Sequence, residues 1–222
     1  RTWNHLGLAL HRGGKHADAG KAYQHAIKLM GQARMLGKRE GSHVLYFNMG
    51  RLYLDAGQAP SARQHLSTYA QLESTHAAHY WLAEACRRDG RLQLEALAYY
   101  QVGVLLDAEK KLEHAIEYYD RYRKYCVEKD DLEGLILALN HMGVNYQLLG
   151  DEEALQISIH CHTDMLDLGG DPFVAHCNLG HVYRKTGREA PSAYHFAQAL
   201  EVAIHDQDFA SENLLYCNLA RV

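Results

Sequence analysis

The sequence predicts an all-α protein in which antiparallel helix hairpins stack on one another as an α-solenoid. Three observations favour this fold class. One set of small, aromatic and apolar residues recurs along the 222 residues at matching offsets. Glycines and the three prolines fall between stretches of helical periodicity. Valine, isoleucine and threonine never form an alternating run with hairpin turns, so we expect no strands.

The pattern is clearest in the stretch VAHCNLGHVYRKTGREAPSAYHFAQAL. Gly180 leaves room for the close approach of another helix, and Tyr183 lies on the same face one turn later. Gly187 then ends this first helix. A second helix follows, and its inward stripe carries Phe196 and Ala199. The two helices therefore close as an antiparallel hairpin.

This unit aligns with five other stretches, each placed on a small residue. The aligned small residues are Gly7, Gly50, Gly103, Gly143, Gly180 and Ala220, and the steps between them are 43, 53, 40, 37 and 40 residues. A helix-breaking glycine usually follows seven residues later, but the third unit has Lys110 there. In the fourth unit the stripe of the second helix is predicted to hold Leu155, Ile159 and His162. In the last unit the chain ends within the first helix.

Breaks between these stretches give the helix boundaries. The predicted helices are 2–12, 15–36, 41–56, 58–72, 75–89, 91–109, 111–128, 131–149, 151–167, 171–186, 189–206 and 209–222. The breaks fall at 13–14, 37–41, 57, 90, 129–131, 150, 169–172 and 187. Pro60, Pro172 and Pro191 each fall at a helix start, where a missing N–H costs little. Asp171 before Pro172 indicates a helix cap.

The 53-residue step contains an additional feature. Ala83, with Gly90 seven residues later, resembles another first helix, yet Gly103 follows Ala83 by only 20 residues. We therefore expect an irregular hairpin around 75–107, in which one helix serves both neighbours. No break is long enough for a domain linker, so we expect one continuous array over 1–222 with about five to six repeats. Both ends look like interior repeats, and we expect the chain to be a piece of a longer protein.

Small residue, aromatic, glycine break, aromatic and alanine at these offsets resemble the tetratricopeptide repeat. That repeat is usually about 34 residues long, so the longer steps imply helices about one to two turns longer. This resembles the expanded variety found in the LGN/Pins group, kinesin light chains and rapsyn. The resemblance implies a right-handed superhelix.

The resemblance also implies a function. The family suggests a non-enzymatic scaffold or adaptor that holds a peptide or helix of another protein in its concave groove. The alternative is a structural subunit built permanently into a large cytoskeletal or ciliary (axonemal) assembly. In that alternative the edges and convex faces make the contacts.

Composition narrows the function classes. The formal net charge is -4, the pI is about 6.5, and no run of five basic residues occurs, so nucleic acid is not an expected partner. No stretch approaches ~18 consecutive apolar residues, so we expect no membrane insertion. Five cysteines without a CxxC pair fit free thiols in a reducing compartment. We therefore expect a cytoplasmic protein, cytoskeletal or ciliary in the alternative, although the chain begins at Arg1 and not at Met.

The 16 histidines raise the question of a metal site. His160 and His162 lie on roughly opposite faces of a helix, although either could meet His176 across a hairpin. Neither HExxH, GxSxG, GxGxxG nor a P-loop motif occurs. Acidic pairs such as Asp130–Asp131 lie at helix starts, where they favour the helix dipole. We therefore expect no catalytic residues, no metal and no cofactor.

Polar residues recur on the first helices, two positions before each small residue. They are His5, Asn48, Gln101, His141, Asn178 and Asn218, and only Trp81 of the irregular unit interrupts the series. A core position would not repeatedly hold amide and imidazole groups, because a buried unpaired polar group costs ~1–3 kcal/mol. In the tetratricopeptide family this side of the first helix lines the concave groove, where asparagines bind the main chain of an extended peptide.

The resemblance therefore implies a set of peptide-binding residues, with arginines suited to a carboxylate on the partner. The set is Asn48, Arg51, Gln101, His141, Asn145, Asn178, His181, Arg184, Asn218 and Arg221. The alternative is that these asparagines bond between neighbouring helices and hold the stack together. The carboxylate clamp of chaperone-binding members is not expected, because His5 and Gln101 stand where that pattern needs asparagine and no matching lysine is present.

Overall fold

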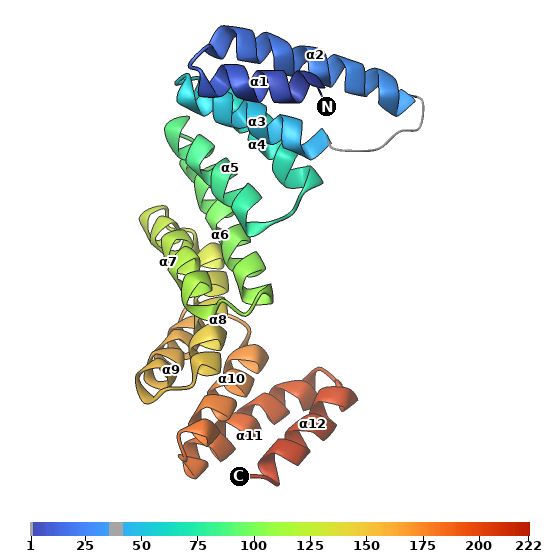
Figure 1. Cartoon of the computed structure of the whole chain (residues 1–222). Coiled ribbons are helices and arrows are strands. Elements are labelled where there is room, and N and C mark those ends of the chain that lie inside the picture. The colour runs from blue at the N-terminus through green and yellow to red at the C-terminus, as the bar shows by residue number, and fades with distance from the viewer. Residues whose placement is uncertain (1, 36–41) are drawn as a thin grey trace. The chain divides into compact units, whose positions relative to one another are not determined.

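The computed structural model describes the backbone of residues 2–35 and 42–222, and it is all-α (Figure 1). The described residues form twelve helices and no strand, which confirms the predicted fold class. The helices are α1 (Thr2–Arg12), α2 (His16–Met35), α3 (Ser42–Asp55), α4 (Ala59–Leu72), α5 (His76–Arg88), α6 (Leu92–Ala108), α7 (Leu112–Glu128), α8 (Leu132–Leu149), α9 (Glu152–Asp167), α10 (Pro172–Lys185), α11 (Glu189–His205) and α12 (Phe209–Leu219). The break predicted at 37–41 includes residues outside the described ones.

The chain divides into two compact units, Arg1–Val102 and Gly103–Val222, which we call unit 1 and unit 2. The division falls inside α6, the uninterrupted helix in the region where we predicted an irregular hairpin. A single continuous array over the whole chain stays a prediction.

In unit 1, α1 pairs with α2 and α3 pairs with α4 (Figure 1). Large side chains of the second helices press on glycines of the first. A Cβ added at Gly7 would lie 2.5 Å from the ring of Tyr23, and one at Gly50 would clash with Leu66. Tyr23 and Leu66 are both fully buried. Burying such a side chain stabilises the fold by ~1.5–3 kcal/mol. The recurring glycine therefore allows the close helix contact that the sequence predicted.

In unit 2, α10 pairs with α11 in the same way, and Gly180 meets the buried ring of Phe196. The hydroxyl of Ser192 also donates to the Gly180 carbonyl across the hairpin, at 2.8 Å. At the start of the unit, Gly103 packs on the ring of Tyr119.

The hairpin α8–α9 departs from the predicted register. The alignment gave Ile159 the offset of Phe196, sixteen residues after the glycine, but the ring of His162 packs on Gly143, and Ser158 donates to the Gly143 carbonyl at 2.7 Å. The serine follows its glycine by 15 residues here and by 12 in α10–α11. The second helix has therefore shifted by three residues, almost one turn. Ile159 is buried instead beside Leu179 of α10.

Left-handed residues end most of the first helices. Five of the predicted glycine breaks have φ between 68° and 79°: Gly14, Gly57, Gly90, Gly150 and Gly187. Lys110, which replaces the glycine after α6, takes the same conformation with φ 60°. A side chain with a Cβ pays roughly 1–2 kcal/mol in this region, whereas glycine does not. The sequence position, and not the residue type alone, thus dictates the turn.

Aspartates cap four helix starts by accepting backbone N–H bonds, namely Asp131, Asp151, Asp171 and Asp208. These include the cap predicted before Pro172. At the other end of the chain, the prediction of a helix to residue 222 was wrong by three residues. The helix α12 ends at Leu219, and Ala220 and Arg221 form a turn. None of the helices in the described part of the chain is long and apolar enough to cross a membrane.

Candidate functional site

The first helices of the hairpins, α1, α3, α8, α10 and α12, present most of the predicted binding residues, and we call this the first-helix surface. In unit 1 it begins with an amide pair. Asn48 of α3 is 9% exposed, and its Nδ2 donates to Oδ1 of Asn4 on α1 at 2.8 Å. An amide has two N–H donors and an acceptor oxygen, so this single bond leaves hydrogen-bonding capacity unused. Asn48 therefore links two neighbouring first helices and still reaches the surface.

One turn further along α3, Arg51 stacks on an aromatic ring. Its guanidinium carbon lies 4.0 Å from the ring centre of Trp81, a cation–π contact. The edge of Trp81 is in turn packed near Phe47, with ring centres 6.2 Å apart. The Nε of Arg51 is buried without a hydrogen-bond partner. Trp81, which interrupts the polar series in the sequence, thus supports the arginine.

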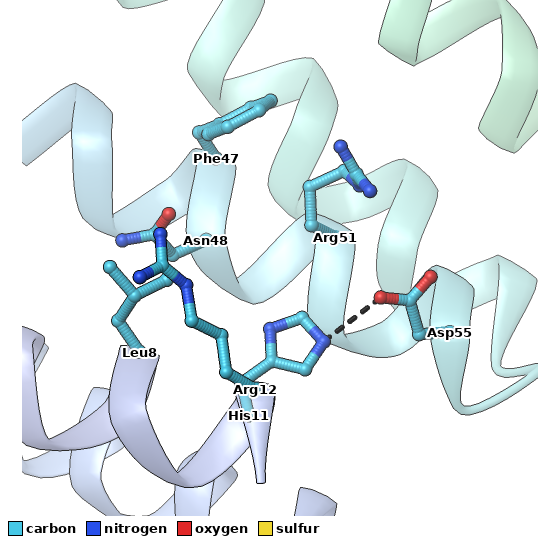
Figure 2. A pocket seen from close by; sticks show the side chains of 7 residues that line it. All are labelled: Leu8, His11, Arg12, Phe47, Asn48, Arg51 and Asp55. Atoms are coloured by element: carbon cyan, nitrogen blue, oxygen red, sulfur yellow. Dashed lines mark hydrogen bonds and ion pairs between the residues drawn. The ribbon is translucent and has the colours of Figure 1, made fainter. Parts of the chain in front are cut away.

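A pocket of about 350 Å³ opens on this part of unit 1 (Figure 2). Both α1 and α3 line it, with Leu8, His11, Arg12, Phe47, Asn48, Arg51 and Asp55. Its single carboxylate, Asp55, lies 2.9 Å from Nε2 of His11. Two guanidinium groups and one amide therefore face the same concave space.

Sequence reasoning found Asn48 and Arg51 but missed the other residues of this pocket. Arg12 and Asp55 both lie five positions after the small residue of their repeat, as Lys185 does. The third and fourth repeats carry Ala108 and Leu148 at that offset, so the alignment gives only a partial signal for charged residues there. The remaining predicted residue of unit 1, Gln101, is exposed on α6 and does not line the pocket.

In unit 2, hydrogen bonds connect the side chains of the first-helix surface. Asn178 of α10 donates to Asn140 of α8 at 3.2 Å. Arg184 donates to Asn218 of α12 at 3.4 Å and to the Nδ1 of His181 at 3.0 Å. Burial, together with the charges of Arg184 and Lys185, lowers the pKa of His181, so its imidazole is neutral and can accept. These contacts tie three first helices together.

Three further predicted residues of unit 2 lie elsewhere. His141 stacks on Tyr119 with ring centres 4.8 Å apart, and burial lowers its pKa. Asn145 is 0% exposed and donates to the His141 carbonyl, so the structure removes it from the accessible surface. Arg221 is exposed but lies in the turn after α12, and not on a helix as we expected.

The histidines form pairs with aromatic rings and with each other. The Nδ1 atoms of His176 and His195 lie 2.9 Å apart. Burial lowers the pKa of His195 to about 4, and the charge of His176 adds to this effect. Tyr183 stacks on His195, with ring centres 5.4 Å apart and planes 3° from parallel. The partner of His176 is thus neither His160 nor His162, the two that the sequence left open. Among the described residues, no three histidine, cysteine or acidic side chains are placed to hold a metal ion.

The same stacking recurs in unit 1, where Tyr53 lies over His65 at 5.3 Å and 7°. Both pairs occupy equal offsets from their glycines, plus three for the tyrosine and plus fifteen for the histidine. These rings lie within hairpins and stabilise packing. Burial also raises the pKa of three thiols, Cys86, Cys161 and Cys177, to about 11, so they are protonated at neutral pH.

Two family models match parts of this chain. One tetratricopeptide repeat model matches residues 47–104, and a second matches 1–29 and 96–122. No curated protein matches the chain as a relative. Among solved structures, BtubC (BKLC) from P. vanneervenii is similar with a TM-score of 0.52 and 17% identity, over 92% of this chain and 79% of that one.

Two other solved structures are similar in fold. The putative kinesin light chain repeats from Podosopora anserina have a TM-score of 0.50 and 13% identity, over 93% of this chain and 96% of that one. Cut9 in the APC/C Cut9–Hcn1 complex has a TM-score of 0.47 and 17% identity, and the match covers 98% of this chain but 42% of that one. Repeat motifs and helix pairing agree with the two family models: the chain contains tetratricopeptide repeats over residues 1–29 and 47–122.

Proposed function

We propose that this chain is a non-enzymatic scaffold that binds an extended peptide or a helix of a partner protein on its first-helix surface. The observation that carries the proposal is the pocket in unit 1, where Arg12, Asn48 and Arg51 converge beside apolar side chains. Arrays of this kind present extended binding surfaces. A few polar groups set into an apolar concave surface are typical of sites that fix a ligand's orientation.

The hydrogen bonds between first helices support this function and do not compete with it. The pairs Asn4–Asn48 and Asn140–Asn178 hold neighbouring helices in place before any partner arrives. A surface that is already ordered loses less conformational entropy on binding. In this proposal asparagine takes both roles that the sequence left as alternatives: one N–H bonds the neighbouring helix, and the remaining donor and acceptor bind the partner's main chain.

Affinity capture with matched variants tests this function. Arg51→Ala with Arg184→Ala removes one cation from each unit's first-helix surface, and Arg91→Ala removes an exposed cation outside it. We expect the double variant to lose the partners that wild type captures and Arg91→Ala to keep them. Circular dichroism confirms that all three proteins are folded. Retention of every partner by a folded double variant would show that other faces make the contacts.

One observation favours the second candidate, a structural subunit of a large assembly. On α12, Phe209 is 71% exposed, Leu214 62% and Tyr216 54%, although each is a large apolar residue. Phe209 and Tyr216 lie seven residues apart on one side of the helix, and an apolar side of this kind suits permanent burial against another subunit. The candidate predicts self-association or aggregation of the purified chain, which Phe209→Glu with Tyr216→Glu would relieve. In either candidate we place the protein in a reducing, cytoplasmic compartment, because none of its cysteines pairs in the described structure.

A further inference from the structure

The pocket between α1 and α3 carries an excess of positive charge. Arg12 and Arg51 both line it, whereas Asp55 is its only acidic residue. Asp55 is already engaged by His11, at 2.9 Å. Among the described residues, neither arginine forms an ion pair with a carboxylate of this chain. The pocket therefore holds two arginines without an ion pair and carries a formal net charge of +1 from Arg12, Arg51 and Asp55.

Arg51 is oriented before any ligand arrives. The ring of Trp81 covers one face of the guanidinium, with 4.0 Å between the guanidinium carbon and the ring centre. The backbone of Arg51 is held in the helix α3. The Nε is buried and cannot be reached from the pocket, so an acceptor that entered would meet the terminal N–H groups of the guanidinium. Guanidinium groups present N–H donors in a planar fork that matches a carboxylate. The stacked arginine is thus suited to receive a planar anion.

The remaining lining residues narrow the ligand further. Leu8 and Phe47 give the pocket an apolar wall beside the cations, which suits a hydrocarbon stem or a neighbouring apolar side chain. Asp55 shares the space, and a doubly charged group would be repelled by it more strongly than a singly charged one. A carboxylate therefore fits the charge pattern better than a phosphoryl group.

We propose that this pocket receives an aspartate or glutamate side chain of the partner, held by Arg12 and Arg51, with an adjacent apolar residue against Leu8 and Phe47. The inference rests on the proposed function, since it names the chemistry of the peptide at one position. It also distinguishes the two units: in unit 2, Arg184 is already bonded to His181 and Asn218.

The test uses a library of random peptides displayed on phage and selected against the full chain. Wild type is expected to enrich peptides in which an acidic residue lies near an apolar one. Arg12→Gln is the main variant, because Arg12 is exposed and its replacement is expected to keep the fold, which circular dichroism checks. Arg12→Gln with Arg51→Gln should abolish the acidic preference. Arg91→Gln, which removes the same charge from the exposed turn after α5, should preserve it.

A double-mutant cycle with one selected peptide then measures the contact directly. Replacing the acidic residue of the peptide by its amide should weaken binding to wild type about tenfold, and binding to Arg12→Gln by less than about twofold. The tenfold loss should shrink at high salt. An equal loss on both proteins would overturn the inference.

The selection also separates the two proposals. If wild type enriches peptides that lack acidic residues, the pocket inference fails and the proposed function stands. If wild type enriches no peptide while the folded protein remains soluble, the peptide-binding function fails, and the pocket inference fails with it.

Discussion

The hairpins α8–α9 and α10–α11 of unit 2 close through the same two contacts, a ring packed on a glycine and a serine bonded to its carbonyl, but with different residues. In α10–α11, Phe196 covers Gly180, and Ser192 donates to the glycine carbonyl. In α8–α9 a histidine covers the glycine, and a serine again donates to its carbonyl, yet both lie three residues further along the chain. The two contacts have moved together. The pairing of a ring and a hydroxyl with the glycine, and not their distance in sequence, defines the closure of the hairpin.

The ring itself is the difference between them. Phe196 is fully buried and has no polar atom to satisfy. His162 is 0% exposed, and neither of its ring nitrogens has a hydrogen-bond partner in the described structure. A neutral imidazole always carries one N–H, so this donor is buried unpaired, at a cost of ~1–3 kcal/mol. The hairpin α8–α9 is therefore closed less favourably than its neighbour.

The largest expected effect comes from removing each ring. Phe196→Ala leaves a cavity beside Gly180 and should destabilise the chain by about 3–5 kcal/mol. His162→Ala should cost clearly less, because it also removes the unpaired nitrogens. Urea unfolding followed by circular dichroism measures both, with the exposed Phe209→Ala as the control, expected within about 0.5 kcal/mol of wild type. Equal losses at the two rings would remove the distinction between the hairpins.

Acid should weaken the histidine-closed hairpin α8–α9 through His162. Burial lowers the pKa of His162 to about 4, below the ordinary value of 6.5 for an unfolded chain. Between these values the unfolded chain binds the proton more strongly, so stability is fully present above about pH 6.5 and is lost as the pH falls toward 4. At about 1.4 kcal/mol per pKa unit, the loss approaches about 3 kcal/mol.

His162→Phe isolates this effect from the other histidines. The variant copies the ring of α10–α11 and should be more stable than wild type at pH 7.5 by about 1 kcal/mol, because no N–H is buried unpaired. Its advantage should grow as the pH is lowered to 4.5. Other buried histidines, His195 among them, titrate in both proteins and cancel in the difference. A constant difference across this pH range would mean that His162 is not the titrating group.

The shared serine contact should have the same strength in both hairpins. Ser158→Ala and Ser192→Ala each remove one buried hydroxyl-to-carbonyl bond, at 2.7 and 2.8 Å. Each should cost about 1 kcal/mol, within the usual range for such bonds. The exposed Ser74→Ala between α4 and α5 serves as the control. A loss at only one serine would indicate that the other bond follows from the ring contact and does not help to fix the register.

The smallest effect concerns the turn that both hairpins share. Gly150 and Gly187 end the first helices in the left-handed conformation, and Lys110 does so after α6. Lys110→Gly should stabilise the chain by about 0.5–1 kcal/mol, because relief of the left-handed strain exceeds the added entropy of the unfolded chain. Gly187→Lys should cost about 1 kcal/mol. Thermal unfolding of the two variants should shift in opposite directions, and a parallel shift would contradict this account.

The helices and their ends followed from local chemistry in the sequence. Glycine at plus seven, proline in a first turn and aspartate before it act within a few residues, so the predicted boundaries lie within one to three residues of those of the described helices. The register of α8–α9 did not follow, because Ile159 and His162 lie on neighbouring parts of one helix face. The way in which α8 and α10 pack against α9 decides whether Ile159 or His162 contacts Gly143.

The candidate site was predictable only in part for a similar reason. The polar series two positions before each small residue pointed to Asn48 and Asn178, and the structure finds each bonded to a neighbouring first helix. The pocket in unit 1 depends on which side chains of α1 and α3 face each other. Arg12 and Asp55 belong to different repeats, and a single repeat, considered alone, does not bring them together.

The stacked tyrosine–histidine pairs give each unit an imidazole whose proton chemical shifts report on its folded state. Tyr53 lies over His65 in unit 1 and Tyr183 over His195 in unit 2, with planes 7° and 3° from parallel. The ring current of each tyrosine displaces the resonances of the imidazole protons beneath it. Loss of the displacement at His65 alone, or at His195 alone, would report that one unit has opened while the other persists. Proton spectra recorded through a denaturant titration would thus follow the two units separately, without any added probe.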